Sequence, residues 1–373
     1  MRIGIDARNL LTPNNGIGRY LLGACEVLCS RGHEIFLFLP SALGGEVKWS
    51  RAQFREGRSK TALCRILWGE FELGKVAAQE RLDVFWGPAH RLPEIRDHNV
   101  PRVLTIHDLV CYEHPATMPV FRRLADRFLM PLAWDRADAI VCVSHATEHA
   151  LKSLRPEMEG KIFTCYPGVR QTVCAPSAPG SVLSGITSGV PYALFVGTVE
   201  PRKNLEKMLA AYATLAPALR QSMKLVIAGG VGWGKHDLRK QIGQLGLTKD
   251  VVPAGFVSDD MLAQLYRHAR FLTFPSLYEG FGFPIVEANS YGIPVMTSNT
   301  SSMPEVGGNA ALLVDPNSVE SIASGFTQLA FDEAIHQRLS AAAKSNAARF
   351  SWAAFAERME TIFHDVISRG RLP

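Results

Sequence analysis

Strand and helix patterns alternate along almost the whole chain, and this alternation is interrupted once. In each half, short apolar runs typical of buried strands are separated by amphipathic stretches typical of helices. Between residues 171 and 190 the composition changes to Ala, Pro, Ser and Gly, which is typical of a linker. A chain of 373 residues with this pattern predicts two doubly wound α/β domains, each with a parallel sheet covered by helices on both faces.

The pattern also predicts the boundaries of these parts. Strands are expected at residues 2–6, 34–39, 83–86, 102–107 and 139–143, and again at 192–197, 224–228, 251–254, 270–274 and 294–298. We therefore expect an N-terminal domain over residues 1–170, a linker over 171–190 and a C-terminal domain over 191–351. Sheets of this kind bind ligands beyond the carboxyl ends of their strands, so the expected binding place is a cleft between the domains.

Composition narrows the class of protein. A net charge of +5 favours an anionic partner, such as a nucleotide diphosphate, a lipid phosphate or nucleic acid, or reflects solubility alone. The seven cysteines form no Cys-x-x-Cys pair, so we interpret them as small apolar residues in a reducing compartment. Because the N-terminus resembles a strand and no run reaches about 18 apolar residues, we expect a cytoplasmic protein, soluble or at most peripheral to a membrane.

Two glutamates frame the sharpest local motif of the chain. After the strand predicted at 270–274, a turn containing Gly280, Phe281 and Gly282 leads into a helix. Glu279 lies on this turn and Glu287 lies inside the helix. Two carboxylates placed in this way can accept hydrogen bonds from sugar hydroxyls. The alternative is a helix-entry carboxylate and a solvated helical glutamate, which explains the flanking glycines and the apolar surroundings poorly.

Two adjacent cations, Arg202 and Lys203, follow another predicted strand. They precede a helix expected to begin near Asn204, where the helix dipole disfavours positive charge. A diphosphate bound there would compensate for this placement. The alternative is a basic pair exposed to solvent. We favour the diphosphate because both side chains lie at the end of a strand.

The first half contributes further candidates at strand ends. Gly16 and Gly18 form a Gly-x-Gly turn before a helix, although the third glycine of the dinucleotide fingerprint is absent, which disfavours a nicotinamide dehydrogenase. His107 and Asp108 follow the strand predicted at 102–107. Ser144 precedes a helix, where we interpret it first as a cap and second as a contact on the acceptor side.

The chain has no Asp-x-Asp metal motif and no His or Cys cluster. We therefore expect no metal and no cofactor, with the charge of a bound diphosphate neutralised by Arg202, Lys203 and helix N-termini. Phe256 and Val257 follow the strand predicted at 251–254 and are expected to line the nucleotide base pocket. The glycine-rich run 229–235 is similar to a phosphate loop but does not have its spacing, and we interpret it as a loop beside the cleft.

The Glu-x7-Glu pattern with its Gly-Phe-Gly turn resembles the signature of the retaining glycosyltransferases of family 4. The resemblance implies the GT-B fold, in which two Rossmann-like domains face a central cleft and a final helix, here 352–373, packs back on the first domain. It implies that Glu279 contacts the hydroxyls of the donor sugar and that Glu287 holds the donor ribose. It also implies that Arg202 and Lys203 neutralise the diphosphate.

For the first half, the resemblance implies that His107 lies by the reacting sugar, at its C6 hydroxyl. The turn at Gly16 and Gly18 is then expected to approach the donor phosphates and the acceptor. The sequences of three motifs are most similar to those of bacterial mannosyltransferases that build O-antigen or related surface polysaccharides. The motifs are Gly-Ile-Gly-Arg-Tyr, Ile-His-Asp-Leu and Glu-Pro-Arg-Lys-Asn-Leu.

The expected donor is therefore GDP-mannose and the expected acceptor a glycan, in particular a lipid-linked one. A UDP-hexose donor is the first alternative. A nucleotide-sugar 2-epimerase of similar fold is a second, and a binding protein without activity is least favoured because all four charged motif residues are present. No nucleic acid partner is expected.

Two basic clusters contain aromatic residues, a combination that suits an anionic membrane surface. A charged helix face explains the same composition equally well. The first cluster comprises Arg51, Arg55, Arg58, Lys60 and Arg65 with Trp49, Phe54 and Trp68, and the second comprises Arg122, Arg123 and Arg127 with Phe121 and Phe128.

Overall fold

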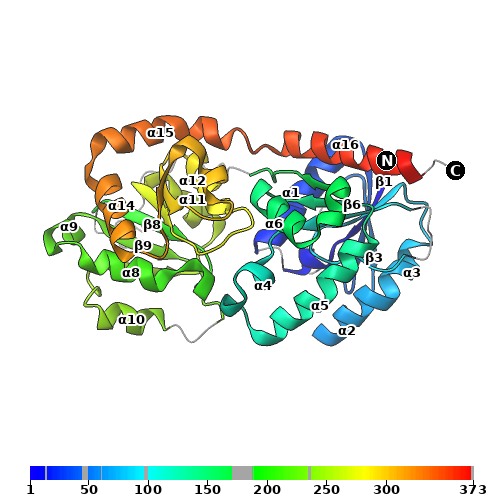
Figure 1. The fold of residues 1–373 in the computed structure, drawn as a ribbon, viewed down its shortest axis with the longest axis horizontal. Coiled ribbons are helices and arrows are strands. Elements are labelled where there is room, and N and C mark those ends of the chain that lie inside the picture. Colours follow the sequence, from blue (N-terminus) through cyan, green and yellow to red (C-terminus); the bar gives the residue numbers. More distant parts are fainter. Residues whose placement is uncertain are drawn as a thin grey trace. The chain divides into compact units, whose positions relative to one another are not determined.

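The computed structural model of the chain describes residues 1–12, 15–43, 49–59, 61–95, 100–169, 187, 189–233 and 237–370 (Figure 1). The chain forms two compact units. The first comprises Met1–Cys111, Phe121–Gly168 and Phe350–Pro373, and the second comprises Tyr112–Val120 and Val169–Arg349. Most of the linker expected at 171–190 lies outside the described residues. The segment Tyr112–Val120 is notable because it lies in the N-terminal half of the chain but makes its contacts with the second unit.

The first unit is built on a sheet of seven parallel strands in the order β3-β2-β1-β4-β5-β6-β7. Strands β1, β4, β5 and β6 are almost fully buried, as their continuous apolar sequences require. The strand bounds are β1 (Arg2–Asp6), β2 (Glu34–Leu39), β3 (Ala52–Glu56), β4 (Val84–Gly87), β5 (Arg102–Ile106), β6 (Ala139–Cys142) and β7 (Ile162–Thr164).

Sequence reasoning missed β3 and β7, the two edge strands of this sheet, and β13 (Ala311–Val314), an edge strand of the second sheet. Edge strand β3 has the sequence Ala-Gln-Phe-Arg-Glu and is at most half-buried, so it lacks the apolar run that identifies a central strand. The helices of this unit are α1 (Gly16–Ser30), α2 (Ala62–Leu67), α3 (Leu73–Ala77), α5 (Val120–Arg136), α6 (His145–Leu154) and α16 (Trp352–Gly370), with the 3-10 helices η1 (Arg8–Leu11) and η4 (Pro156–Lys161) and the π-helix η2 (Trp68–Glu72). Helix α4 (Val110–Glu113) spans the boundary between the units, and the 3-10 helix η3 (Pro115–Thr117) belongs to the second unit.

The second unit repeats the same design with six parallel strands in the order β10-β9-β8-β11-β12-β13. The strand order changes direction between β8 and β11, and in doubly wound sheets ligands bind beside such a switch point. The strands are β8 (Tyr192–Val196), β9 (Lys224–Ala228), β10 (Val251–Gly255), β11 (Phe271–Phe274), β12 (Val295–Ser298) and β13 (Ala311–Val314).

Helices cover both units, so the predicted fold class of two Rossmann-like parallel α/β domains is confirmed. The helices of the second unit are α8 (Leu205–Thr214), α9 (Pro217–Ser222), α10 (Leu238–Gln244), α11 (Asp259–His268), α12 (Phe283–Ser290), α13 (Met303–Gly307), α14 (Val319–Phe331) and α15 (Glu333–Ala347), with the turns η5 (Pro201–Lys203) and η6 (Gly308–Ala310).

The last helix, α16, packs on α1 within the first unit (Figure 1). The Nε and Nη2 atoms of Arg31, just after α1, donate to the two carboxylate oxygens of Glu360 at 2.7 and 2.8 Å. Nearer the start of α16, the Trp352 ring lies against α1 at Gly23. A Cβ atom added at Gly23 would lie 2.1 Å from Trp352 Cζ2, so only glycine fits there.

We expect Gly23→Ala to destabilise the protein by about 1–3 kcal/mol, because the new methyl group overlaps the Trp352 ring. The matched control is Gly243→Ala in α10, where a Cβ atom would meet nothing within 4 Å and alanine favours the helix. Urea unfolding followed by circular dichroism measures both changes. Equal stabilities of the two variants would show that the contact between α1 and Trp352 is not tightly packed.

Candidate active site

The charged residues of the two sharpest motifs meet at one edge of the second sheet. Strands β8 and β11 are parallel neighbours, so their carboxyl ends lie side by side. The chain leaving β8 forms the turn η5, which contains Arg202 and Lys203, and the chain leaving β11 forms the loop that contains Glu279. A hydrogen bond from the Leu277 amide to the Arg202 carbonyl, 2.9 Å long, joins the two loops.

Glu279 binds both cations. Arg202 Nη1 donates to Glu279 Oε2 at 2.6 Å, and Lys203 Nζ donates to Glu279 Oε1 at 2.7 Å. The side chains of Glu279 and Lys203 are only 7% and 10% exposed. The Lys203 ammonium also lies 4.6 Å from the centre of the Phe274 ring. The structure thus brings together three residues that sequence reasoning had assigned separately to a donor site.

Burial and charge act in opposite directions on these groups. Burial raises the pKa of the Glu279 carboxyl, but Arg202 and Lys203 outweigh it and lower this pKa to about 2. Burial lowers the pKa of Lys203, and Glu279 reverses only part of that change. Glu279 is therefore an ionised carboxylate at neutral pH, and its charge is held inside the protein by its two partners.

Glu200 completes this charge cluster and was missed by sequence reasoning. Arg202 Nη2 donates to Glu200 Oε1 at 2.7 Å, and Trp233 Nε1 donates to Glu200 Oε2 at 3.1 Å. The two cations and two carboxylates balance one another. This corrects our interpretation of Arg202 and Lys203 as uncompensated charges at a helix N-terminus. They lie in the turn η5 before α8, and carboxylates already neutralise them.

The loop between β11 and α12 is held by serine hydroxyls. Ser301 Oγ donates to the Glu279 carbonyl at 2.5 Å, and Ser302 Oγ lies 2.9 and 3.0 Å from the carbonyls of Glu279 and Phe281. Gly282 has a φ of +95°, which glycine adopts without strain. These contacts fix the backbone of Glu279, while sequence reasoning found only the glycines because Ser301 and Ser302 belong to a distant loop.

Glu287 lies on α12, half-buried, as the sequence predicted. Its Oε2 accepts a hydrogen bond from Tyr266 Oη at 2.7 Å, and the Tyr266 ring stacks on Tyr291. Phe256 and Val257 follow β10 at the carboxyl edge of the sheet, where Phe256 is 73% exposed. A carboxylate and an exposed aromatic ring at this edge suit a ribose and a base, and these two roles stay predictions.

The glycine-rich run after β9 pairs with the exit of β8. The Val199 amide donates to the Gly230 carbonyl at 3.0 Å, and the Gly232 amide donates to the Val199 carbonyl at 3.1 Å. A Cβ atom at Gly229 would lie 1.9 Å from the Gly197 carbonyl oxygen, which explains the glycine there. The run therefore fixes the backbone next to Glu200, and Gly234 and Lys235 lie outside the described residues.

In the first unit, His107 lies buried at the carboxyl end of β5. Its Nε2 lies 2.7 Å from the Pro88 carbonyl oxygen, which can only accept, so Nε2 carries the proton and Nδ1 holds a lone pair. Burial lowers the pKa of His107 more than the Pro88 carbonyl and Asp108 raise it, so the ring is neutral at pH 7. Its tautomer therefore leaves Nδ1 able to accept a hydrogen bond from a hydroxyl group.

The remaining first-unit candidates have local structural roles. Asn15 Oδ1 accepts a hydrogen bond from the Gly18 amide at 2.7 Å, so the turn at Gly16 and Gly18 is the N-terminus of α1. Asp108 Oδ1 accepts from the Val110 amide at 3.2 Å. Ser144 is fully buried and caps α6, as predicted, through the Thr147 amide. A contact of Asp108 or Ser144 with the acceptor stays a prediction.

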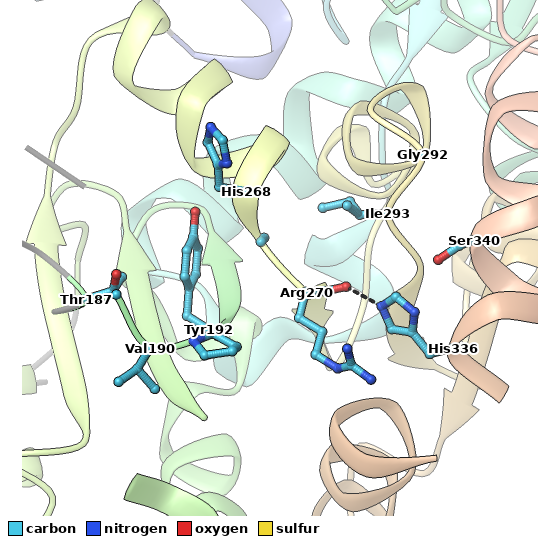
Figure 2. Close-up of a pocket in the computed structure, with 12 residues that line it drawn as sticks. Thr187, Val190, Tyr192, His268, Arg270, Gly292, Ile293, His336 and Ser340 are labelled. Carbon is cyan, nitrogen blue, oxygen red and sulfur yellow. Dashed lines mark hydrogen bonds between the residues drawn. The ribbon is translucent and has the colours of Figure 1, made fainter. Parts of the chain in front are cut away.

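A cavity of about 370 Å³ lies at the opposite edge of the second sheet (Figure 2). Its lining includes Tyr192, which begins β8, and Arg270, which precedes β11. His336, which also lines the cavity, donates from Nε2 to the Arg270 carbonyl at 2.8 Å (Figure 2). Because it lies at the amino ends of the strands, away from Glu279 and Arg202, it is not the place of the chemistry. Within the described ranges, no group of three or more His, Cys, Asp or Glu side chains is arranged to hold a metal ion.

Comparison with known families decides the class of protein. The family model described as Glycosyltransferase Family 4 matches residues 14–220, and the model described as Glycosyl transferases group 1 matches residues 184–346. The chain belongs to glycosyltransferase family 4. It is 33% identical over 276 residues to O-antigen chain mannosyltransferase B of Escherichia coli, a match that covers 72% of this chain and 71% of that protein. It is also 29% identical to the serotype-specific mannosyltransferase WbdA of Escherichia coli, over 68% of this chain and 32% of WbdA.

Solved structures agree on the fold. Sucrose-phosphate synthase from Thermosynechococcus elongatus superposes with a TM-score of 0.77 at 18% identity, over 99% of this chain and 100% of that one. WaaG, a glycosyltransferase involved in lipopolysaccharide biosynthesis, has a TM-score of 0.74 at 16% identity, over 97% and 99% of the two chains. This family 4 enzyme is a glycosyltransferase with the GT-B fold, and the corresponding predictions are confirmed.

We expect Glu279→Gln to lower the free energy of unfolding at pH 7 by about 3 kcal/mol, because it leaves two buried cations without their carboxylate. The ionised carboxylate stabilises the fold fully above its unfolded pKa of 4.5, and this contribution is lost as pH falls towards its folded pKa of about 2. Urea unfolding of both proteins at pH 7 and pH 3 should therefore show a smaller difference at pH 3. A difference that does not depend on pH would contradict this charge assignment.

Proposed function

We propose that this glycosyltransferase transfers mannose from GDP-mannose, with retention of anomeric configuration, to a lipid-linked glycan in surface polysaccharide synthesis such as that of O-antigen. The observation that carries the proposal is the buried set of Arg202, Lys203 and Glu279 at the switch point between β8 and β11. Two relatives at 29% and 33% identity, both from Escherichia coli, are named as mannosyltransferases, which supports mannose over another hexose.

The charge cluster suits the departure of a nucleoside diphosphate. When the bond between the sugar C1 and the phosphate oxygen breaks, its electron pair stays on the diphosphate. Arg202 and Lys203 are held in place to stabilise that charge. The acceptor hydroxyl oxygen bonds to C1 on the face the diphosphate leaves, and its proton passes to the departing phosphate oxygen. The buried Glu279 carboxylate is proposed to accept hydrogen bonds from hydroxyls of the sugar.

His107 has a complementary role in this proposal. Its Nε2 donates to Pro88, so the lone pair on Nδ1 can accept a hydrogen bond from a sugar hydroxyl, the C6 hydroxyl by resemblance to the family. Glu287 would accept hydrogen bonds from the ribose. We propose that no metal ion is needed, because Arg202, Lys203 and the amide groups at the start of α12 can donate hydrogen bonds to the diphosphate oxygens.

The donor can be tested by binding. We expect GDP and GDP-mannose to raise the melting temperature, with a stabilisation of about 2.7 kcal/mol at 100 times the dissociation constant, and UDP and ADP to have little effect. Lys203→Ala should abolish this shift and reduce mannose transfer at least about 100-fold. Lys207→Ala is the matched control, because Lys207 on α8 is bonded to the exposed Asn317 and, among the described residues, has no contact with Glu279 or Glu200. Stabilisation by UDP but not by GDP would reject the mannosyl assignment.

A lipid-linked acceptor would lie at a membrane surface, and helix α5 has side chains suited to contact with one. Helix α5 exposes large apolar side chains at positions 121, 124 and 128, which share one helix face: Phe121 is 90%, Leu124 57% and Phe128 72% exposed. Arg122, Arg123 and Arg127 lie beside them on the helix. Each helix among the described residues is too short or too polar to span a bilayer.

The first basic cluster of the sequence, around Trp68, is more buried in the structure than the cluster on α5. Trp68 is only 8% exposed and packs in a core with Phe36 and Phe38, while Arg55 is paired with Glu80. Trp49 and Phe54 are half-buried, whereas Arg51, Arg58 and Arg65 are exposed, and Lys60 lies outside the described residues. Among the described residues, this cluster therefore presents arginines without a fully exposed aromatic ring. We propose that α5 contacts an anionic bilayer, with the phenylalanines inserted at the level of the headgroups and the arginines beside lipid phosphates.

We expect the double substitution Phe121→Ser and Phe128→Ser to reduce binding to vesicles of phosphatidylglycerol and phosphatidylcholine by at least about ten-fold, because two exposed rings no longer enter the bilayer. Phe331→Ser, on a phenylalanine that is 43% exposed at the end of α14, should leave binding unchanged. Cosedimentation at low and high salt separates apolar insertion from electrostatic attraction, and salt should weaken the wild-type interaction. Equal binding by all three proteins would exclude α5 as the membrane contact.

A further inference from the structure

A histidine from the N-terminal half of the chain lies beside the charge cluster of the second unit. The segment Tyr112–Val120, from the end of α4 to the start of α5, belongs to the second unit by its contacts. Within it, the Thr117 amide and hydroxyl both donate to the His114 carbonyl, at 3.0 and 2.7 Å. The backbone that carries His114 is therefore fixed by its own turn, and Pro115 restricts it further.

The His114 ring packs against the loop that holds Glu279. The centres of the His114 and Tyr278 rings lie 5.3 Å apart, with an angle of 39° between their planes. Tyr278 directly precedes Glu279, and its carbonyl accepts a hydrogen bond from Arg202 Nη1 at 2.9 Å. His114 thus lies next to the backbone that positions Arg202.

The ring nitrogens of His114 are open to a ligand. The side chain is half-buried, and neither nitrogen is hydrogen bonded to any residue that the structure describes. One face of the ring is covered by Tyr278, so the ring is held while its nitrogens stay accessible. An imidazole in this setting can donate one hydrogen bond and accept another.

We propose that His114 is a further donor-binding residue, whose ring hydrogen bonds to a phosphate oxygen of the nucleoside diphosphate bound by Arg202. This inference rests on the proposed function, because it requires a diphosphate at Arg202. It goes beyond the motifs of the sequence, since His114 lies about ninety residues before Arg202 in the other half of the chain and matches none of them.

The charges around His114 give the proposal a measurable consequence. Burial lowers the pKa of His114, Glu113 raises it, and Arg202 lowers it further, so the ring is neutral in the free enzyme at pH 7. Arg202 in turn contacts Glu200 and Glu279, and Glu279 contacts Lys203. A diphosphate at Arg202 adds negative charge beside His114 and favours its protonated form, so nucleotide binding should take up a proton.

Calorimetric titration with GDP, GMP and guanosine tests the proposal in wild type, His114→Ala and His114→Gln. We expect His114→Ala to weaken GDP binding about ten-fold and to leave guanosine binding unchanged, because the contact is to phosphate. His114→Gln should recover part of the affinity through its amide. In two buffers of different ionisation enthalpy, wild type should bind more protons with GDP than His114→Gln, and the difference in affinity should grow from pH 8 to pH 6.

The control is His268→Ala, which changes an exposed histidine of the same unit at the cavity on the opposite edge of the sheet. GDP binding by His114→Ala equal to that of wild type would overturn the inference while leaving the proposed function intact. Equal weakening of guanosine and GDP would also overturn it, because it would indicate a general structural effect. If wild type binds UDP in place of GDP, the same series with UDP and uridine decides the role of His114. If wild type binds no nucleoside diphosphate, the proposed function and the inference fail together.

Discussion

The site depends on one buried carboxylate that binds two cations. Glu279, Arg202 and Lys203 are largely removed from water, so the Glu279 carboxylate depends on the two cations, and Lys203 depends on Glu279. These residues come into contact because β8 and β11 are adjacent, which places the loop after β8 and the loop after β11 at the same edge of the sheet. Ser301 and Ser302, from the loop after β12, then hold the Glu279 backbone in place. The parallel sheet thus positions the charges before any ligand arrives.

This arrangement changes how the cations are understood. The sequence suggested cations at a helix N-terminus that only a bound anion could justify. The structure shows Arg202 already bonded to Glu200 and Glu279, and Lys203 bonded to Glu279. Their side chains are oriented without a ligand, so less reorganisation is needed when charge develops on a leaving diphosphate. The proposed role of Arg202 and Lys203 in donor binding therefore rests on their fixed orientation and not on unpaired positive charge.

The two basic clusters with aromatic residues have similar compositions but different structural environments. Both basic clusters of the sequence contain aromatic rings, yet Trp68 packs into a core while Phe121 is almost fully exposed. Sequence composition does not separate these cases, because burial of one ring depends on which elements pack over it. Among the described residues, none packs over the face of α5 that carries Phe121 and Phe128 to the extent of burying them. That exposure favours a partner surface over a charged helix face.

The sequence by itself determined the repeated α/β design, the central strands, and the family motif around Glu279 and Glu287, since all of these are encoded by local periodicity and spacing. It missed the edge strands β3, β7 and β13, and every residue of β3 is at most half-buried. Only the tertiary structure decided that Lys203 and Glu279, 76 residues apart, share a hydrogen bond. Only it placed His114 beside Tyr278. Such contacts depend on strand order and on which segment crosses to which unit, and no local pattern of residues encodes either.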